Sequence, residues 1–516
     1  MKKFIYKSAL VLTLFSMLLS SCTKGFEEMN TDPNGIPDAL PSQLLAPALV
    51  GAMQYNMLRN RNFNNEIMQV TVNVTDAEGQ VSRYDFRSNW ADYLYNGLYS
   101  ELTNFKDIYK IASDTTTSNY NRSYMAISLI CQTWIYSILT DTYGDIPYFQ
   151  SNKGRDSLNF EPAFDRQRDI YLDMFQKLEE ANKLLGFRTA IDAAADPVYY
   201  GNVVRWQKFG NSLYLRLLMR ISGKQEVAAQ VKAKIKEIVD EKSGEYPRIA
   251  NNEESAVLRW TGVAPYISPL NTVREQDFRA PAIASYFIDN LVNWNDPRID
   301  IPTYGASGVN RWGIASSQGA YVGIQSGYAP GSEPVKRSFF LSNTSAASLQ
   351  TDAMTGILMN YAEVQFILAE AALKGWISGD PKTFYTNGAL ASITYWLPNW
   401  TTIINPVTGL PGDINTHLAA ADNQWLESET FEEKMEKIHL QKYYALFLVD
   451  MQQWFEYRRT GYPKLPIGPG VRNNGIMPAR MTYPVYVQST NPTNYKLAVA
   501  AQGPDVISTP VWWQKP

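Results

Sequence analysis

Apolar residues recur every three or four positions in several long stretches of the chain, which is the spacing of one face of an α-helix. The clearest stretch is 122–140, where Tyr124, Ile127, Cys131, Trp134 and Ile138 follow this period. The same pattern predicts helices over 166–186, 202–221 and 357–374, and shorter stretches predict helices over 42–58 and 91–112. The chain is therefore predicted to be mainly α-helical.

The longest predicted helix covers 431–458. Thr430 followed by Glu433 has the pattern of a capping box, in which each side chain bonds to the backbone of the other. Gly461 and Pro463 supply a stop signal after the last apolar residue of the stripe. Paired amphipathic helices with short connections suggest helical-hairpin repeats, although no clean 34-residue period is present.

Strand patterns are few. The segments 70–74 (VTVNV) and 482–487 (TYPVYV) are predicted as short strands. The region 241–352 is rich in Gly, Pro, Ser, Asn and aromatic residues and has little helical period. Its stretch 303–335 is long for a loop but carries several rings, which favours an ordered recognition insert over a disordered linker.

The N-terminus has the pattern of an export signal. Three lysines precede an apolar core over 8–19, which is too short to span a bilayer as a helix. The core ends in Leu19-Ser20-Ser21-Cys22, and small residues before a cysteine suit a lipoprotein signal peptidase. The chain is thus predicted to comprise a signal peptide (1–21), a lipidated polar tether (22–41) and a single domain (42–516). Several acyl chains on Cys22 would anchor it stably.

Charge and cysteine content narrow the function further. Without Lys2, Lys3 and Lys7 of the predicted signal, the formal net charge falls from −3 to −6. No basic stripe remains, so nucleic acid is not an expected partner. With Cys22 acylated only Cys131 is left, and no intrachain disulfide can form. Aromatic residues make up 13% of the chain, and rings on loops suit the recognition of sugars or peptides.

The sequence lacks the motifs of common catalytic sites. HExxH, CxxC, G-x-S-x-G and a Walker A loop are absent. There are two histidines, His417 and His439, and His439 fits a capped or core-edge position better than that of a base. No catalytic residue, metal site or cofactor is therefore predicted. A glycosidase carboxylate pair stays open as an alternative, because the chain holds 50 acidic residues.

Two acidic patterns have simpler structural explanations. Asn30-x-Asp32-x-Asn34-Gly35 is similar to the first half of an EF-hand loop, but position twelve is Pro41 rather than the closing Glu. It is interpreted as an Asx-type turn. Asp141 and Asp145 flank Gly144, where the end of a helix and hydrogen bonds at a turn account for them.

Several motifs, in order and at plausible spacing, resemble the SusD/RagB-like family of outer-membrane nutrient-binding lipoproteins. The first is the lipobox at Cys22, followed by FEEMNTDPN over 26–34. The second is Thr133-Trp134 with YGDIPY over 143–148, and the third is the segment 361–372, which begins with YAE and ends with LAEAA. The last two are the segment 441–463, which begins with QKY and ends with WFEYRRTGYP, and RMTYP over 480–484. The resemblance covers nearly the whole chain. The tether departs from the family pattern, which often places several acidic residues directly after the cysteine as a surface-export signal. Here Lys24 intervenes, and the acidic Glu27-Glu28 come later.

The resemblance implies a fold of about four tetratricopeptide-like helix pairs with loops and a variable region. It implies a surface-exposed outer-membrane protein that captures an oligosaccharide or a peptide. It also implies a partner, a TonB-dependent outer-membrane transporter to which the ligand passes. A secreted glycoside hydrolase and a helical-repeat adaptor without a small ligand are the alternatives from other functional classes.

The ligand site of this family varies between members, so the candidate contacts come from loop aromatics and their neighbours. The primary candidates are Trp294, Arg311, Trp312 and Tyr321; the secondary ones are Tyr266, Tyr304 and Tyr328, with polar contacts from Asn73, Arg83 and Tyr84. A structural role is the alternative for each of them, and for Trp294 in particular, since it precedes Asp296-Pro297-Arg298.

Overall fold

The computed structural model describes residues 39–75, 79–299, 310–332, 334–405 and 408–515. Contacts within the chain define two units, 1–40 and 41–516. The second unit carries the fold described below. The predicted signal peptide, Cys22 and most of the tether lie outside the described residues. In the described part of the chain, no helix combines the length and apolarity needed to cross a membrane.

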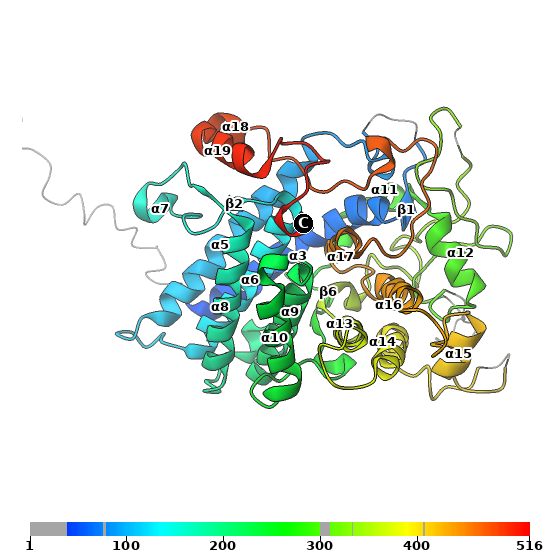
Figure 1. Cartoon of the computed structure of the whole chain (residues 1–516), viewed down its shortest axis with the longest axis horizontal. Helices are drawn as coiled ribbons and strands as arrows, with labels where there is room; N and C mark the ends of the chain where they lie inside the picture. Colours follow the sequence, from blue (N-terminus) through cyan, green and yellow to red (C-terminus); the bar gives the residue numbers. More distant parts are fainter. Residues whose placement is uncertain (1–38, 76–78, 300–309, 333, 406–407, 516) are drawn as a thin grey trace, which may run out of the picture. The chain divides into compact units, whose positions relative to one another are not determined.

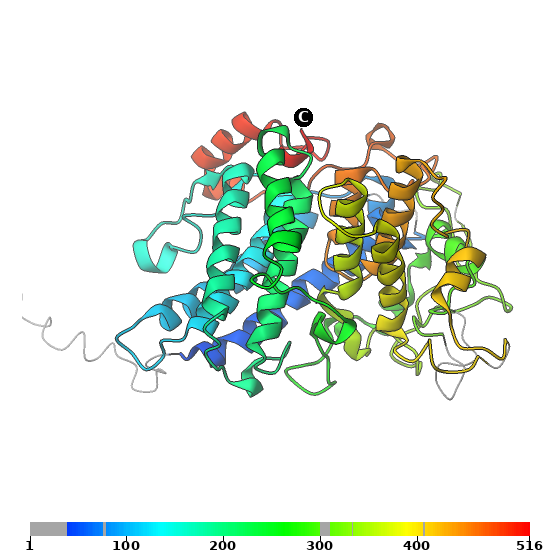
Figure 2. The same cartoon turned by 60° about the horizontal axis from the view of Figure 1, so that its bottom comes forward.

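Packed helices form most of the second unit, as the sequence predicts (Figure 1). The major helices are α3 (Pro41–Arg59), α5 (Trp90–Ser113), α6 (Arg122–Tyr143), α8 (Gln167–Leu185), α9 (Val203–Ile221), α10 (Gln225–Lys236), α13 (Tyr361–Leu373), α14 (Pro381–Trp396), α16 (Phe431–Ala445), α17 (Gln452–Thr460) and α19 (Pro492–Gln502). Consecutive helices pack against each other, as α5 does on α6, α8 on α9 and α13 on α14 (Figure 2). One continuous apolar core runs through them from Leu45 to Trp513.

Side-chain caps fix where several helices begin. Asn121 accepts hydrogen bonds from the Ser123 and Tyr124 backbone amides at the start of α6. The predicted capping box at Thr430 and Glu433 is confirmed at the start of α16. Asn360 caps α13, so this helix begins at Tyr361 and not at 357. The preceding residues form a strand instead.

The predicted helix over 431–458 is wrong in its middle, because the chain breaks between α16 and α17. Residues 446–449 (LFLV) are all buried, whereas four consecutive helical positions would point around the whole helix. Leu448 and Asp450 take positive φ angles of 67° and 26°. Asp450 holds the break, since its carboxylate accepts from Gln452 Nε2 at 2.9 Å and its carbonyl accepts from Asn60.

Three small antiparallel sheets join segments that are distant in sequence. β1 (Thr71–Val72) pairs with β5 (Ala282–Ile283), β2 (Ile146–Pro147) with β3 (Phe164–Asp165), and β4 (Ala256–Leu258) with β6 (Gly356–Met359). β1 confirms a strand within 70–74. The strand predicted over 482–487 does not form: the Tyr483 amide donates to Asp505, Pro484 has no amide hydrogen, and α18 (Val487–Thr490) follows.

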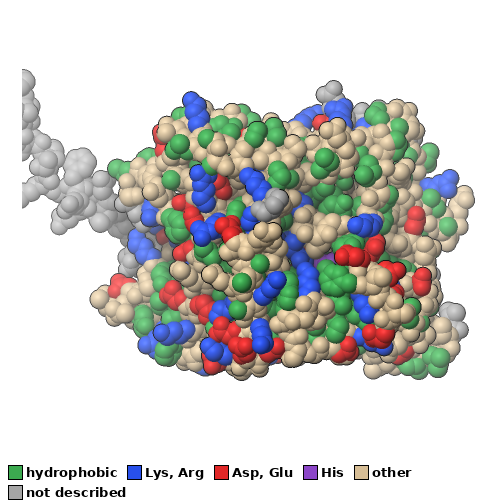
Figure 3. All heavy atoms as spheres, in the orientation of Figure 1, with side chains coloured by type: hydrophobic (Ala, Val, Ile, Leu, Met, Phe, Trp, Pro, Cys, Tyr) green, Lys and Arg blue, Asp and Glu red, His purple; other side chains and the backbone are tan. Residues whose placement is uncertain are grey.

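The insert 241–352 is ordered where it is described, but it is less irregular than the sequence predicts. It contains α11 (Glu275–Arg279), α12 (Ser285–Asn293), β4 and β5. A second small apolar cluster of Val72, Ala282, Ala284, Ile324 and Tyr328 closes around the β1–β5 pair. On the face drawn in Figure 3, acidic and basic side chains are intermingled.

Candidate ligand-binding site

A cavity of about 790 Å³ opens where the insert meets α14. Its wall includes Asn387, Leu390, Ala391 and Thr394, which recur at helical spacing on one side of α14. The 3-10 helix Asn252–Glu254 lies against this wall, because Asn252 Nδ2 donates to the Ala391 carbonyl and to Thr394 Oγ1, both at 3.0 Å. The cavity therefore has a rigid side of helix backbone and a mixed polar and apolar surface.

Arg311 lines this cavity and is held by three contacts. Its Nε donates to the Trp396 carbonyl at 3.0 Å, its guanidinium lies 5.0 Å from the centre of the Trp396 ring, and it forms an ion pair with Asp352. Asp352 in turn accepts from the Met354 amide at 2.8 Å. This chain of contacts ties the insert to the end of α14.

Tyrosine and tryptophan side chains form another part of the cavity wall. Tyr395 donates its hydroxyl to the Met354 carbonyl at 2.7 Å, and burial raises the pKa of this phenol. Trp396 is also buried, while Tyr361 is half-buried and presents part of its ring. Neutral hydroxyl and amide groups thus share the wall with apolar side chains, with the guanidinium groups of Arg259 and Arg311 and with the carboxylate of Glu253.

The structure brings three of the sequence-predicted residues together elsewhere. Arg83 stacks over the Tyr328 ring at 4.5 Å and donates from Nε to the Tyr328 carbonyl at 3.1 Å. The Tyr328 hydroxyl donates to the carbonyl oxygens of Asn73 and Thr75 at 3.2 and 3.3 Å. Arg83 and Tyr328 are buried, as is the neighbouring Tyr84, so these contacts join the early loop to the insert.

The predicted tryptophans fill the core. Trp312 has no exposed surface, and its ring packs 4.9 Å from Phe447 and under the Arg298 guanidinium. Trp294 is 6% exposed and meets Tyr444 edge-on at 5.0 Å. Neither ring is open to a ligand in this structure. The polar, turn-prone sequence around Trp294 and the Gly- and Ser-rich sequence around Trp312 suggest exposure. Instead Trp294 packs against Tyr444 of α16 and Trp312 against Phe447 in the 446–449 break.

Of the remaining predicted residues, three are partly exposed and one lies in a segment that the structure does not describe. Tyr321 is half-buried and donates its hydroxyl to the Ile299 carbonyl at 2.6 Å. Tyr266 and Asn73 also keep part of their surface exposed. Tyr304 lies outside the described residues. Among the predicted residues that the structure describes, Arg311 is the one that lines the cavity.

Sequence reasoning missed most of the cavity wall because it did not predict α14. The signal that could have found this helix is the spacing of Asn387, Ala391 and Thr394, with Asp380 before Pro381 as a cap and first turn. A helix face that carries an amide and a hydroxyl among small residues indicates a polar groove.

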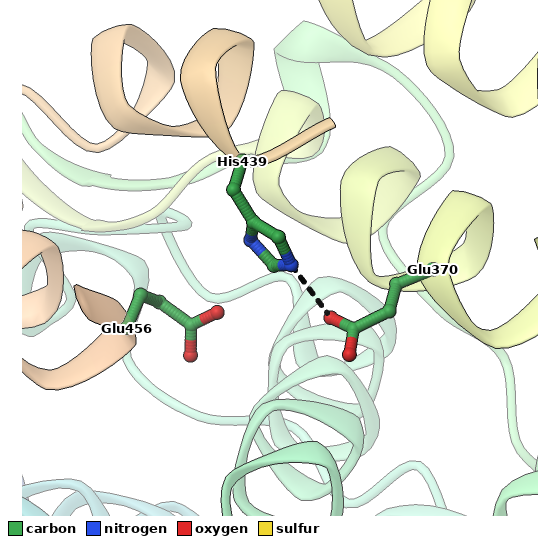
Figure 4. A group of neighbouring side chains, drawn as sticks. All are labelled: Glu370, His439 and Glu456. Atoms are coloured by element: carbon green, nitrogen blue, oxygen red, sulfur yellow. Dashed lines mark ion pairs between the residues drawn. The ribbon is translucent and has the colours of Figure 1, made fainter. Parts of the chain in front are cut away.

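A buried group of Glu370, His439 and Glu456 has ligand atoms within 4.8 Å of one another, the spacing of a metal site (Figure 4). Cationic side chains already occupy these carboxylates. Arg459 donates to both oxygens of Glu370 at 2.8 and 2.6 Å, and Lys442 donates to Glu456 at 2.7 Å. A bound cation would face these two positive charges, so the group fits an internal ion network better than a metal site.

Asp141 and Asp145 do not converge on a shared site. Asp141 accepts from the Tyr171 hydroxyl at 2.6 Å and from Trp513 Nε1 at 2.8 Å, inside the core. Asp145 accepts from the Gln167 amide at 2.9 Å at the start of α8. Both contacts match the structural interpretation of this acidic pair.

The paired helices, the ordered insert and the cavity between them define a class, that of helical-repeat proteins with a polar cavity beside an inserted loop region. A sequence model of the SusD-like family, described as "Starch-binding associating with outer membrane", matches residues 33–484. The chain therefore belongs to the SusD-like family. No curated protein sequence matches the chain significantly.

Solved structures agree with this family. A SusD homologue from Bacteroides fragilis is 24% identical, with a TM-score of 0.74 over 93% of this chain and 100% of that one. A SusD homologue from Bacteroides uniformis is 24% identical, with a TM-score of 0.73 over 92% and 99%. A SusD homologue from Flavobacterium johnsoniae, described as chitin-binding, is 22% identical, with a TM-score of 0.73 over 92% and 98%. At these identities the likeness establishes the fold.

Proposed function

We propose that this protein is a lipid-anchored outer-membrane protein that captures a nutrient oligosaccharide and delivers it to a TonB-dependent transporter. The observation that carries the proposal is the cavity beside α14, whose volume of about 790 Å³ lies within the usual range for small-ligand sites. Family membership and the chitin-binding relative support a glycan as the ligand. The partner transporter follows from the family resemblance alone.

The chemistry of the cavity favours a hydroxylated ligand. Asn251, Asn387 and Thr401 are exposed on its wall and can exchange hydrogen bonds with sugar hydroxyls. Leu390 and the half-buried ring of Tyr361 offer apolar surface to the C–H face of a sugar. Arg311 stays in the proposed site. Contacts from Tyr266, Tyr321 and Asn73 remain predictions.

A binding experiment tests the ligand class and the site together. The soluble chain 23–516 is titrated calorimetrically with oligosaccharides and peptides of defined composition. Asn387→Ala should lower the affinity for the glycan about tenfold or more, because one hydrogen bond to a sugar hydroxyl is lost. Asn293→Ala is the matched control, since Asn293 is exposed on α12 away from the cavity.

Each result decides between the functional classes. Binding to a peptide alone would reject the glycan, and catalytic cleavage of a bound glycan would favour the glycoside-hydrolase alternative. Glycan binding unaffected by Asn387→Ala would keep the function and reject this cavity. Binding to no member of the panel, with a stable protein partner recovered, would favour the adaptor.

The anchor is tested separately in cells. Replacing Cys22 with Ser should abolish incorporation of labelled fatty acid and leave the signal peptide uncleaved. Protease added to intact cells should digest the wild-type protein if it lies on the cell surface. Incorporation of labelled fatty acid that persists in Cys22→Ser would reject Cys22 as the lipid attachment site.

A further inference from the structure

Arg259 is the first residue after β4, and its side chain forms part of the cavity wall. The pairing of Val257 with Ile357 and of Leu258 with Gly356 fixes β4, which ends at Leu258, directly before Arg259. Its side chain is exposed and lines the cavity with Arg311 and Met354. The backbone that carries this guanidinium is therefore held by a sheet.

The two arginines of the cavity differ in their partners. Arg311 is neutralised by Asp352. Arg259 contacts the Met354 Sδ at 2.8 Å, and a thioether is a weak acceptor. In the described part of the chain no carboxylate lies within ion-pair distance of Arg259, and Glu253 on the same cavity wall makes no ion pair with it. Most of the N–H donors of Arg259 are left for a ligand.

We infer that the glycan captured in this cavity carries a carboxylate, as a hexuronic acid does, and that Arg259 binds it. The inference rests on the proposed function and names the chemical class of its substrate. A planar guanidinium matches a carboxylate with two parallel N–H···O bonds, which a neutral sugar cannot accept in the same way. A charged acceptor also forms a stronger hydrogen bond than a sugar hydroxyl does.

Glu253 provides a second test of the ligand's charge, because its own charge is opposite to that of Arg259. It is an exposed acid on the wall of the same cavity, next to Asn252. Its charge repels an acidic ligand and has no such effect on a neutral one. Removing the charge of Glu253 should therefore strengthen the binding of a hexuronate, whereas removing the charge of Arg259 should weaken it. A neutral glycan should respond little to either change.

The experiment titrates the soluble chain 23–516 with galacturonate, glucuronate and mannuronate oligosaccharides, each beside its methyl ester. The ester keeps the sugar and removes the charge. We expect at least one acid to bind about tenfold or more tighter than its ester, with affinity falling as salt rises. Arg259→Gln should remove this preference, and Glu253→Gln should increase it. Arg337→Gln is the matched control, because Arg337 is an exposed arginine outside the cavity.

The outcomes separate this inference from the proposed function. Equal binding of acids and esters, or an acid preference that survives Arg259→Gln, overturns the inference. Binding of neutral glycans but of no hexuronate overturns it and leaves the proposed function intact. A sulfated oligosaccharide is included, since a sulfate ester is a second source of negative charge. Binding of the sulfated ligand alone would overturn the assignment of a carboxylate.

Discussion

Glu370 on α13 and Arg459 on α17 form a doubly hydrogen-bonded ion pair inside the protein. The two N–O distances are 2.8 and 2.6 Å, Glu370 has no exposed side-chain surface, and Arg459 has 7%. Burial acts to raise the pKa of Glu370, but the charges of Arg459 and Lys374 hold it well below its usual value. The pair joins helices that are almost ninety residues apart in sequence.

Glu370→Gln should lower the free energy of unfolding by about 3–5 kcal/mol, because it leaves the Arg459 charge buried with an incomplete set of partners. Chemical denaturation of the purified domain measures this loss. The matched control is Glu427→Gln, in which an exposed carboxylate 3.5 Å from Lys434 is removed. That change should cost about 0–1 kcal/mol. Equal losses in both variants would contradict a structural role for the buried pair.

His439 should make the fold sensitive to acid. Burial, assisted by the nearby charges of Arg459 and Lys442, lowers its pKa to about 3, against the attraction of Glu370 and Glu456. In the unfolded chain the imidazole has its ordinary pKa of about 6.5, so the unfolded state binds more protons between these values. The contribution of His439 to stability is therefore complete above pH 6.5 and is lost as pH falls toward 3.

The variant His439→Asn isolates this effect. Between pH 7 and pH 4.5 the wild-type protein should lose about 2–3 kcal/mol more unfolding free energy than the variant, since two pH units lie below the ordinary pKa. Denaturation curves at the two pH values give the comparison. A pH dependence that is the same in both proteins would show that another group controls acid unfolding.

Glu66 should have the opposite effect. Its side chain is buried, and burial raises its pKa to about 8 despite the charge of Arg61 and a hydrogen bond from the Ser82 backbone. The folded state then keeps a proton that the unfolded state releases above about pH 4.3, so stability falls as pH rises from there toward 8. Glu66→Gln should stabilise the fold at pH 8, on the order of 5 kcal/mol, and should have little effect at pH 4. A destabilised variant at pH 8 would show that the carboxylate is ionised and paired.

The helices were predictable because apolar residues recur at helical spacing in the sequence, as in 122–140, where the structure has α6 from Arg122 to Tyr143. Their breaks were harder to predict. The 446–449 segment continues an apolar run, and only the tertiary contacts of Asp450 with Asn60 show that the helix stops there. Local sequence patterns carry no information about such partners, which lie almost four hundred residues away.

The candidate site shows the same limit. Loop composition selected Arg311, which lines the cavity and is held there by Asp352 and Trp396; a contact with a ligand stays a prediction. It also selected Trp312, which the fold buries completely. Whether a ring on a Gly-rich segment faces solvent or the core depends on what packs over it, and for Trp312 that partner is Phe447, distant in sequence.

Trp312→Ala should therefore act on stability. Loss of a fully buried indole costs about 3–5 kcal/mol, and the Arg298 guanidinium would lose the ring it stacks on at 4.8 Å. Trp376→Ala is the comparison, since Trp376 is only half-buried and should cost less. Thermal unfolding followed by circular dichroism measures both. A Trp312→Ala protein of wild-type stability with abolished glycan binding would restore this residue to the ligand site.

Gly468 should resist substitution because its backbone touches another loop. A Cβ atom added there would lie 2.2 Å from the Ser326 carbonyl oxygen and 2.3 Å from that of Gly327. These are backbone atoms that cannot rotate away, so Gly468→Ala should separate the two loops and destabilise the fold by about 1–3 kcal/mol. The displaced loop also carries Tyr328, whose ring stacks on Arg83.

Gly223→Ala provides the matched control, since no atom lies within 4 Å of the added Cβ. That variant should unfold at the wild-type temperature or slightly above it, because alanine restricts the unfolded chain. Thermal unfolding compares the two, and limited proteolysis shows whether cleavage near 326–328 increases in Gly468→Ala alone. If both variants behave like the wild type, the contact between the two loops does not contribute to stability.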